Sequence, residues 1–257
     1  MRVVISDRRS GERSKIPACR FRDIHCHNSG SEPARQPPTL RLQFVFVSNM
    51  NFLHHWLCRS NRWRRTVEQR VPWVVGQHHL GASVLELGPG PGLTTDLLRL
   101  SAPHLTALEL DPVLAESLRS RMRGSNVKVV TGDATNVPFP DKQFSSVVSF
   151  TMLHHVPSCA LQDRVLREVW RVLQAGGIFV GSDSLDGWVM RLIHIGDTLV
   201  PIDPVTFGAR LTAVGFEGVM VERNSDAFRF QARRPVRRTF EHDKLSDETS
   251  SFTAASL

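Results

Sequence analysis

The chain has 257 residues, enough for one α/β domain with extensions, and 41% of them are hydrophobic, which suffices for an ordinary core. No apolar run approaches the length of a membrane span, and four scattered cysteines are too few for a disulfide framework, which indicates a reducing, cytoplasmic compartment. The net charge of +7 is uneven: residues 1–75 hold 14 Lys/Arg and 5 Asp/Glu, whereas residues 76–257 hold 18 and 20. This distribution disfavours nucleic-acid enzymes, whose basic surface usually surrounds the active site.

The first 49 residues differ in composition from the rest of the chain. They are rich in Arg, Ser and Pro and show no sustained hydrophobic period, which predicts a disordered leader over 1–49. Acidic residues within this segment argue against a mitochondrial presequence. Because a helical apolar pattern begins at Met50, we expect this residue to be the functional start of the folded unit.

Histidine and cysteine residues gather at several places without a standard metal-binding spacing. One cluster supplies adjacent rather than spaced ligands, and it consists of Cys19, His25, Cys26 and His27. The pairs His54-His55 and His78-His79 have no acidic or cysteine partners at ligand spacing. The sequence therefore predicts no metal site.

Residues 50–75 form an amphipathic, basic helical segment. Apolar residues recur at mostly helical spacing, and several arginines decorate the same stretch. Three interpretations remain open at this point. The helix packs on the main domain as an ordinary core element, covers a substrate site as a lid, or touches an anionic membrane surface.

The stretch 84–98, VLELGPGPGLTTDLL, reads as a buried strand, a glycine turn and a helix start. Glycines at this point let backbone approach a ligand at the carboxyl end of the strand. The spacing of Gly88, Gly90 and Gly92 is GxGxG, and Leu93 occupies the last position of the dinucleotide fingerprint GxGxxG. The Lys-Ser/Thr ending of a phosphate-binding loop is absent as well, so neither of these ligands is indicated.

Polar residues follow the next strands in order. The strand 104–110 contains Glu109 near its carboxyl end, where a carboxylate accepts hydrogen bonds from both hydroxyls of an adenosyl ribose. The strand 127–131 precedes Gly132-Asp133-Ala134, and the strand 146–150 precedes His154 and His155.

The second half of the chain continues the alternation of helices and strands. A helical stripe over 161–173 is expected to end at Gly176-Gly177 and to lead into a strand at 178–181. Residues 184–203 mix apolar and polar side chains and are expected to form a variable substrate segment. A helix at 204–214, strands at 216–221 and 227–232, and a disordered tail at 233–257 complete the predicted chain.

The motifs of residues 80–232 together resemble those of the class I S-adenosylmethionine-dependent methyltransferases, whose first motif is acid-x-Gly-x-Gly-x-Gly. The resemblance implies an α/β, doubly wound, Rossmann-like domain over 76–232, with a seven-stranded sheet whose last strand is antiparallel. It further implies that S-adenosyl-L-methionine is the cofactor and that its methyl group moves by in-line displacement. The implied contacts are Glu86, Gly88, Gly90 and Gly92 for the methionine moiety, Glu109 for the ribose, and Asp133 with Ala134 for the adenine.

The acceptor is constrained mainly by what the sequence lacks. The Asn/Asp-Pro-Pro-Tyr/Phe motif of amino-methylating DNA enzymes and the Pro-Cys pair of cytosine-C5 enzymes are both missing. A small-molecule or lipid-like acceptor is therefore favoured over nucleic acid, with His154 or His155 as the candidate general base. Two alternatives stay open, an RNA methyltransferase and a non-catalytic S-adenosylmethionine-binding protein.

Overall fold

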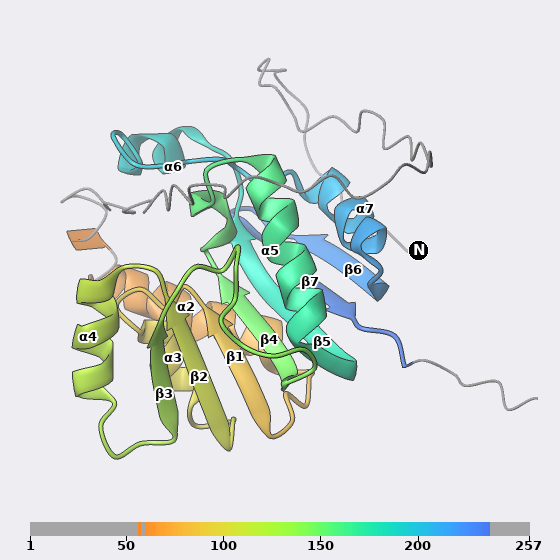
Figure 1. Ribbon diagram of the computed structural model, residues 1–257. Helices are drawn as coiled ribbons and strands as arrows, with labels where there is room; N and C mark the ends of the chain where they lie inside the picture. Colours follow the sequence, from red (N-terminus) through yellow and green to blue (C-terminus); the bar gives the residue numbers. More distant parts are fainter. Residues whose placement is uncertain (1–55, 58–59, 237–257) are drawn as a thin grey trace, which may run out of the picture.

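The computed structural model describes residues 56–57 and 60–236 (Figure 1). The predicted leader at 1–49, the Cys19–His27 cluster, the His54-His55 pair, the proposed start at Met50 and most of the predicted tail lie outside the described residues.

One sheet organises the domain, and its strand order is β3-β2-β1-β4-β5-β7-β6. The sheet is parallel except for β7, which pairs antiparallel with β5 on one side and β6 on the other. The predicted seven-stranded sheet with an antiparallel last strand is thus confirmed. The strands are β1 Ser83–Leu87, β2 His104–Glu109, β3 Val127–Thr131, β4 Phe144–Phe150, β5 Leu173–Ser184, β6 Glu217–Arg223 and β7 Ala227–Arg233.

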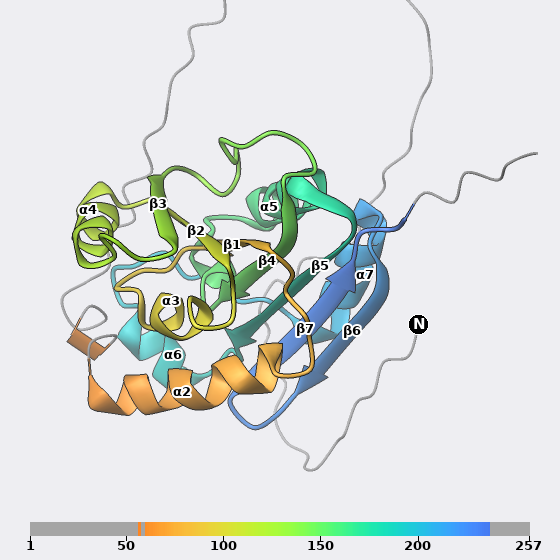
Figure 2. The same ribbon diagram turned by 90° about the horizontal axis from the view of Figure 1, so that it is seen from below.

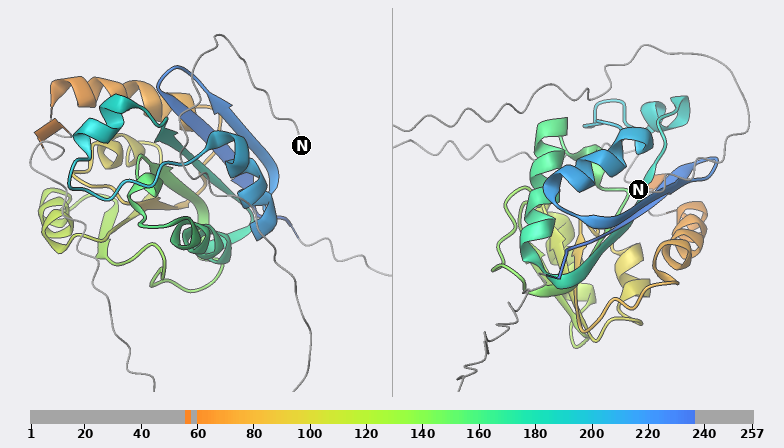
Figure 3. Two further views of the ribbon diagram at one scale, coloured as in Figure 1. Left: turned by 90° about the horizontal axis from the view of Figure 1, so that it is seen from above. Right: turned by 90° about the vertical axis from the view of Figure 1, so that its right-hand side faces the viewer.

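Helices cover both faces of the sheet, as a doubly wound fold requires. One face carries α2 Asn61–Val75, α3 Leu93–Leu98 and α4 Pro112–Arg121, and the other carries α5 Cys159–Val172 and α7 Pro204–Val214 (Figures 2 and 3). The short helices η1 Leu153–His155 and α6 Trp188–Ile193 follow the carboxyl ends of β4 and β5 (Figure 1). The carboxyl edge of the sheet is therefore left to loops and short helices, which is where α/β proteins bind ligands.

Helix α5 starts and ends for identifiable reasons. Its N-cap is Ser158, whose hydroxyl accepts a hydrogen bond from the third helical N–H. It ends at Val172 and not at the predicted Gly176, because Leu173 turns into extended backbone and is fully buried beside Phe144. Gly176 instead lies inside the long strand β5 with a φ of 76°. The burial of Leu173 therefore determines where α5 ends, and the Gly176-Gly177 pair does not.

Ser145, near the start of β4, joins this strand to β1. Its hydroxyl accepts a hydrogen bond from the Ser83 N–H at 3.0 Å and lies 2.8 Å from the carbonyl oxygens of Leu80 and Ser83. The hydroxyl thus fixes the start of β1 against β4.

Helix α2 packs against the sheet, as the core interpretation of this segment expects. Val67, Val71 and Val74 are buried in a cluster with residues of β1, β4, β5 and α3. At its carboxyl end the helix receives a further contact, because the Arg229 guanidinium donates to the Trp73 carbonyl oxygen and lies 5.2 Å from that indole ring. These contacts make α2 part of the folded domain.

None of the described helices is long and apolar enough to cross a membrane.

Replacing Val71 by alanine tests the contribution of α2. The side chain is 4% exposed, so Val71→Ala leaves a cavity and should lower the free energy of unfolding by about 1–3 kcal/mol. Val113→Ala is the matched control, since Val113 lies on a helix but is 75% exposed. Chemical denaturation of both variants checks this, and equal stabilities would show that α2 contributes little to the domain.

Candidate functional site

The glycine loop between β1 and α3 has a left-handed backbone at each of its three glycines. Gly88, Gly90 and Gly92 have φ values of 61°, 54° and 82°. A Cβ atom on Gly88 would lie 2.3 Å from Cγ of Met152, and one on Gly92 would lie 2.4 Å from a methyl group of Leu118. A Cβ atom on Gly90 would meet no protein atom within 4 Å. Two of the glycines therefore serve protein packing, and the third faces open space.

Glu109 ties the end of β2 to this loop. One carboxylate oxygen accepts the Gly90 N–H at 2.8 Å, and the other accepts the Asp111 N–H at 3.0 Å. The residue is 7% exposed, and burial raises the pKa of its carboxyl group, although the backbone hydrogen bonds oppose the shift. Each oxygen keeps capacity for a further donor, so the residue fits a role in binding hydroxyl groups.

Glu86 lies beneath the loop and does not line its surface. The side chain is 1% exposed, and its two oxygens accept hydrogen bonds from the hydroxyl groups of Thr94 and Thr95, the latter at 2.7 Å. Burial raises the pKa of Glu86 to about 7, against the lowering effect of both hydrogen bonds. In this structure Glu86 fixes the start of α3, which differs from the direct ligand contact that the sequence motif implied.

Asp133 and Ala134 follow β3 at the same edge of the sheet. Asp133 is exposed, and its carboxylate accepts hydrogen bonds from the N–H and the hydroxyl of Thr135 at 2.7 and 2.8 Å. Thr131, at the end of β3, pairs with Glu109 of β2, so Asp133 and Glu109 follow neighbouring positions of adjacent strands. The structure thus brings the predicted ribose and adenine contacts to adjacent strand ends.

A cluster of histidines occupies the other half of the site. The ring centroids of His154 and His155 are 4.2 Å apart, and each lies 5.1 Å from the ring of His194. Asp183, at the end of β5, accepts a hydrogen bond from Nδ1 of His154 at 2.5 Å and is itself 1% exposed. We call His154, His155 and His194 the histidine cluster.

His194 and Asp183 are not among the site residues predicted from the sequence. Residues 184–203 were expected to form a substrate segment, but no spacing connects a histidine in that segment with His154, forty residues earlier in the chain. The contact depends on tertiary structure: Gln162 donates to the carbonyl oxygens of Leu153 and Val200, at 3.2 and 2.9 Å. These bonds hold η1 against the segment that carries His194.

Met152 connects the two halves of the site. Its side chain lies against Gly88, and the residue directly precedes η1, which contains His154 and His155. The histidine cluster therefore lies next to the glycine loop, on the β4 side of it.

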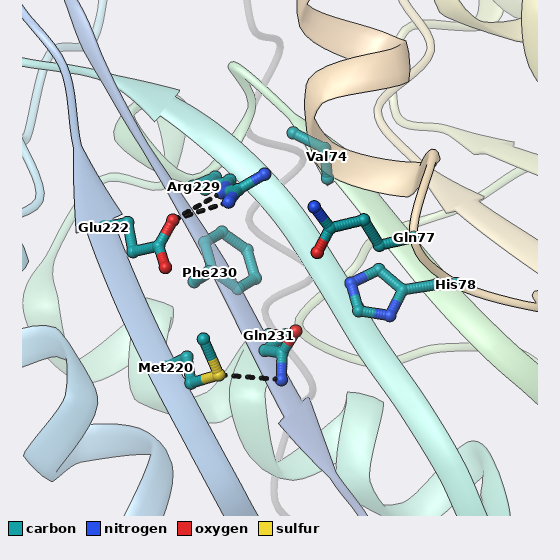
Figure 4. Close-up of a pocket in the computed structure, with 8 residues that line it drawn as sticks. All are labelled: Val74, Gln77, His78, Met220, Glu222, Arg229, Phe230 and Gln231. Atoms are coloured by element: carbon teal, nitrogen blue, oxygen red, sulfur yellow. Dashed lines mark hydrogen bonds and ion pairs between the residues drawn. The ribbon is translucent and has the colours of Figure 1, made fainter. Parts of the chain in front are cut away.

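A separate hollow lies between the end of α2 and the strands β6 and β7 (Figure 4). The Arg229 side chain crosses it and pairs with Glu222. None of the predicted site residues is among those that line it, which are Val74, Gln77, His78, Met220, Glu222, Arg229, Phe230 and Gln231. We regard it as the junction at which α2 docks onto the sheet.

The strand order, the glycine loop after β1 and the carboxylate at the end of β2 define a nucleotide-type site in a doubly wound α/β protein. Residues 85–181 match the family model described as a methyltransferase domain. Residues 85–181 therefore carry a methyltransferase domain, similar to those of the class I S-adenosylmethionine-dependent methyltransferases, and S-adenosylmethionine is the cofactor of such domains.

Individual relatives differ in their acceptors. The chain is 26% identical over 222 residues to 2-methyl-6-phytyl-1,4-hydroquinone methyltransferase 1 of Oryza sativa subsp. japonica, covering 84% of this chain and 65% of that protein. It is 41% identical over 81 residues to a probable ribosomal RNA small subunit methyltransferase A of Methanothermobacter thermautotrophicus, covering 28% of this chain and 30% of that protein. The chain thus spans less than two thirds of either relative.

A solved structure supports the fold. Phosphoethanolamine N-methyltransferase 2 of Haemonchus contortus, in complex with phosphomonomethylethanolamine and S-adenosylhomocysteine, superposes with a TM-score of 0.57 at 13% identity. The match covers 72% of this chain and 56% of that one. At this level of identity the likeness concerns the fold alone.

The buried Glu86 carboxyl group makes stability depend on pH. Its pKa rises from 4.5 to about 7 on folding, so between these pH values the folded state binds a proton that the unfolded state has released. Stability should therefore fall as pH rises through this window, by roughly 3 kcal/mol at 1.36 kcal/mol per unit. Denaturation of Glu86→Gln between pH 4.5 and 8 should show a flatter profile than the wild type. Glu68→Gln, on the exposed side of α2, should keep the wild-type slope, and an unchanged slope in Glu86→Gln would contradict the assignment.

Proposed function

We propose that the protein transfers the methyl group of S-adenosylmethionine to a small, apolar acceptor. The observation that carries this proposal is the exposed apolar surface next to the histidine cluster. The segment that contains His194 exposes four large apolar side chains to solvent, with exposed fractions of 77%, 48%, 51% and 68% for Trp188, Val189, Leu192 and Ile195. Such a patch beside a ligand site is typical of a binding surface for an apolar molecule.

The cofactor fits along the carboxyl ends of four strands. In our proposal the methionine moiety lies over Gly90, the ribose hydroxyls donate to Glu109, and the adenine lies beside Asp133 and Ala134. Gly88 and Gly92 shape the loop, and Glu86 supports it from below. The sulfonium then faces the β4 side of the loop, where the histidine cluster lies.

The reaction requires alignment more than side-chain chemistry, because the cofactor carries its own activated methyl group. An acceptor atom that arrives protonated has to lose its proton. We propose that this proton leaves through His154 and His155, because Asp183 fixes the ring of His154 in one orientation.

RNA methylation is the second candidate function. It is favoured by the ribosomal RNA relative and by the exposed residues Arg62, Arg64 and Arg65 on α2. The same arginines suit peripheral contact with an anionic membrane, which would deliver an apolar acceptor. The phytyl-hydroquinone relative covers far more of this chain than the ribosomal RNA relative does, and we therefore place the apolar acceptor first.

A comparison of two glycine variants distinguishes the loss of a ligand contact from the cost of backbone strain. Gly90 and Gly124 both have positive φ values, 54° and 75°, and both face open space. Gly90→Ala and Gly124→Ala should each cost roughly 1–2 kcal/mol of stability through left-handed strain. Only Gly90→Ala should also weaken S-adenosylhomocysteine binding, by roughly tenfold for about 1.4 kcal/mol of lost contact. Calorimetry decides this, and equal affinities in both variants would remove Gly90 from the cofactor site.

The acceptor class is tested by turnover. Formation of S-adenosylhomocysteine is measured with two substrate pools, an apolar lipid extract that includes prenylated hydroquinones and a preparation of ribosomal RNA. We expect turnover with the lipid pool, and turnover with RNA alone would support the second candidate function.

A charged side chain introduced into the exposed apolar patch tests whether the acceptor binds there. Leu192→Glu should lower kcat/KM about tenfold, since burying half of a leucine is worth of the order of 1.4 kcal/mol. S-adenosylhomocysteine affinity should not change. Val236→Glu is the control, because Val236 is 65% exposed and follows β7 on another part of the domain. Equal kcat/KM values for both variants would place the acceptor elsewhere.

A further inference from the structure

We infer that the histidine cluster binds a divalent transition-metal ion, with Nε2 of His154, Nε2 of His194 and one nitrogen of His155 as ligands. Zinc is the ion for which we design the test. The inference is separate from the proton transfer proposed above, because a histidine whose Nε2 binds an ion cannot take up a proton there; the two roles belong to the ion-bound and the ion-free protein.

The geometry of the histidine cluster suits three-coordinate binding by protein. One candidate ligand atom from each histidine lies within 4.8 Å of the other two. Tetrahedral zinc with Zn–N distances of 2.0–2.1 Å requires nitrogen atoms about 3.3 Å apart. The three rings therefore have to move closer together when an ion binds. His154 and His194 are 3% and 8% exposed, so two of the ligands belong to a buried site.

The hydrogen bonds fix the tautomers that metal binding needs. Nδ1 of His194 lies 2.6 Å from the Met190 carbonyl oxygen, which only accepts, so this nitrogen carries the proton. Nδ1 of His154 lies 2.5 Å from the Asp183 carboxylate and carries the proton for the same reason. In the neutral form of each ring, Nε2 therefore holds the lone pair that a metal binds.

These two hydrogen bonds reproduce the environment of metal-binding histidines. Such a residue almost always donates its second N–H to a carboxylate or a backbone carbonyl, which orients the ring and raises its basicity. His154 has the carboxylate and His194 has the carbonyl. Asp183 is also fixed, because it accepts the backbone N–H of Ser184 at 2.7 Å. A tertiary contact thus orients His154, and a local contact in the last turn of α6 orients His194.

The composition of the site points to a class of ion. Three imidazoles suit zinc, copper, iron or nickel, whereas magnesium and calcium prefer oxygen ligands. Three protein ligands also leave a fourth position open, which is the pattern of catalytic zinc sites and not of structural ones.

The test measures zinc on the full chain at pH 7.5, by equilibrium dialysis followed by elemental analysis. The matched variants are His194→Asn, whose amide can still donate to the Met190 carbonyl, and His104→Asn, an exposed histidine at the start of β2. We expect His194→Asn to lose one equivalent of zinc relative to the wild type and His104→Asn to lose none. The comparison is between variants because His25, Cys26 and His27 offer other ligands in the full chain.

Two further measurements identify the ligands. The Asp183→Asn variant should bind the same equivalent 10- to 100-fold more weakly, the usual effect of removing a carboxylate that orients a ligand. Cobalt(II) bound to the wild type should show the visible absorption of a four- or five-coordinate nitrogen site, and His194→Asn should lack it.

The inference is overturned if wild type and His194→Asn bind equal amounts of zinc, or if the cobalt spectrum is that of the hydrated ion. Melting temperatures recorded without metal establish that both variants fold. S-adenosylhomocysteine affinity is measured alongside and should be equal in both. Loss of cofactor binding with retained zinc would count against the proposed function and leave the metal site standing.

Discussion

The hydrogen bond from the Gly90 N–H to the Glu109 carboxylate is the contact on which the cofactor half of the site depends. Pro89 and Pro91 restrict this loop, but its three glycines keep wide conformational freedom, so contacts with neighbouring residues are needed to fix its shape. Glu109 fixes the centre of the loop from the neighbouring strand, and Met152 covers its beginning. Burying the Glu109 carboxylate is costly, and the hydrogen bonds that it accepts from two backbone N–H groups offset that cost.

Glu86, beneath the loop, is a second buried carboxyl group that fixes local structure through the hydrogen bonds it accepts. Its carboxyl group is more deeply buried than that of Glu109, and two threonine hydroxyls satisfy it. Two buried acids from adjacent strands therefore hold a loop and a helix start in register. This arrangement explains why a motif known for ligand contact also determines local structure, and why removal of either acid is expected to alter more than binding.

Much of the fold was predictable because its signals are local. Apolar runs, turn glycines and the Asp111 and Asp203 helix caps mark the ends of strands and helices within a few residues. The helix at Pro204–Val214 is placed as predicted, and the glycine loop and Glu109 lie at the strand ends expected of them.

The remainder depends on contacts between distant residues. The boundary between α5 and β5 follows from the burial of Leu173 beside Phe144, and the sequence around Gly176 suggests otherwise. The burial of Glu86 follows from the two threonines that cover it. The approach of His194 to His154 follows from bonds made by Gln162, a residue with no sequence signal of its own. Local patterns carry no information on such pairings.

The segment between β5 and α7 has a consequence for attempts to change what the protein accepts. It joins a strand of the sheet to a helix that covers it, and it carries both the exposed apolar side chains and His194. A chimera that exchanges this segment for that of another methyltransferase would look like a simple swap of a substrate-binding module. It would also remove one member of the histidine cluster and leave Asp183 and His154 behind without it. Redesign of acceptor scope would therefore have to transplant the segment with its histidine restored, or replace single surface side chains while keeping the segment in place.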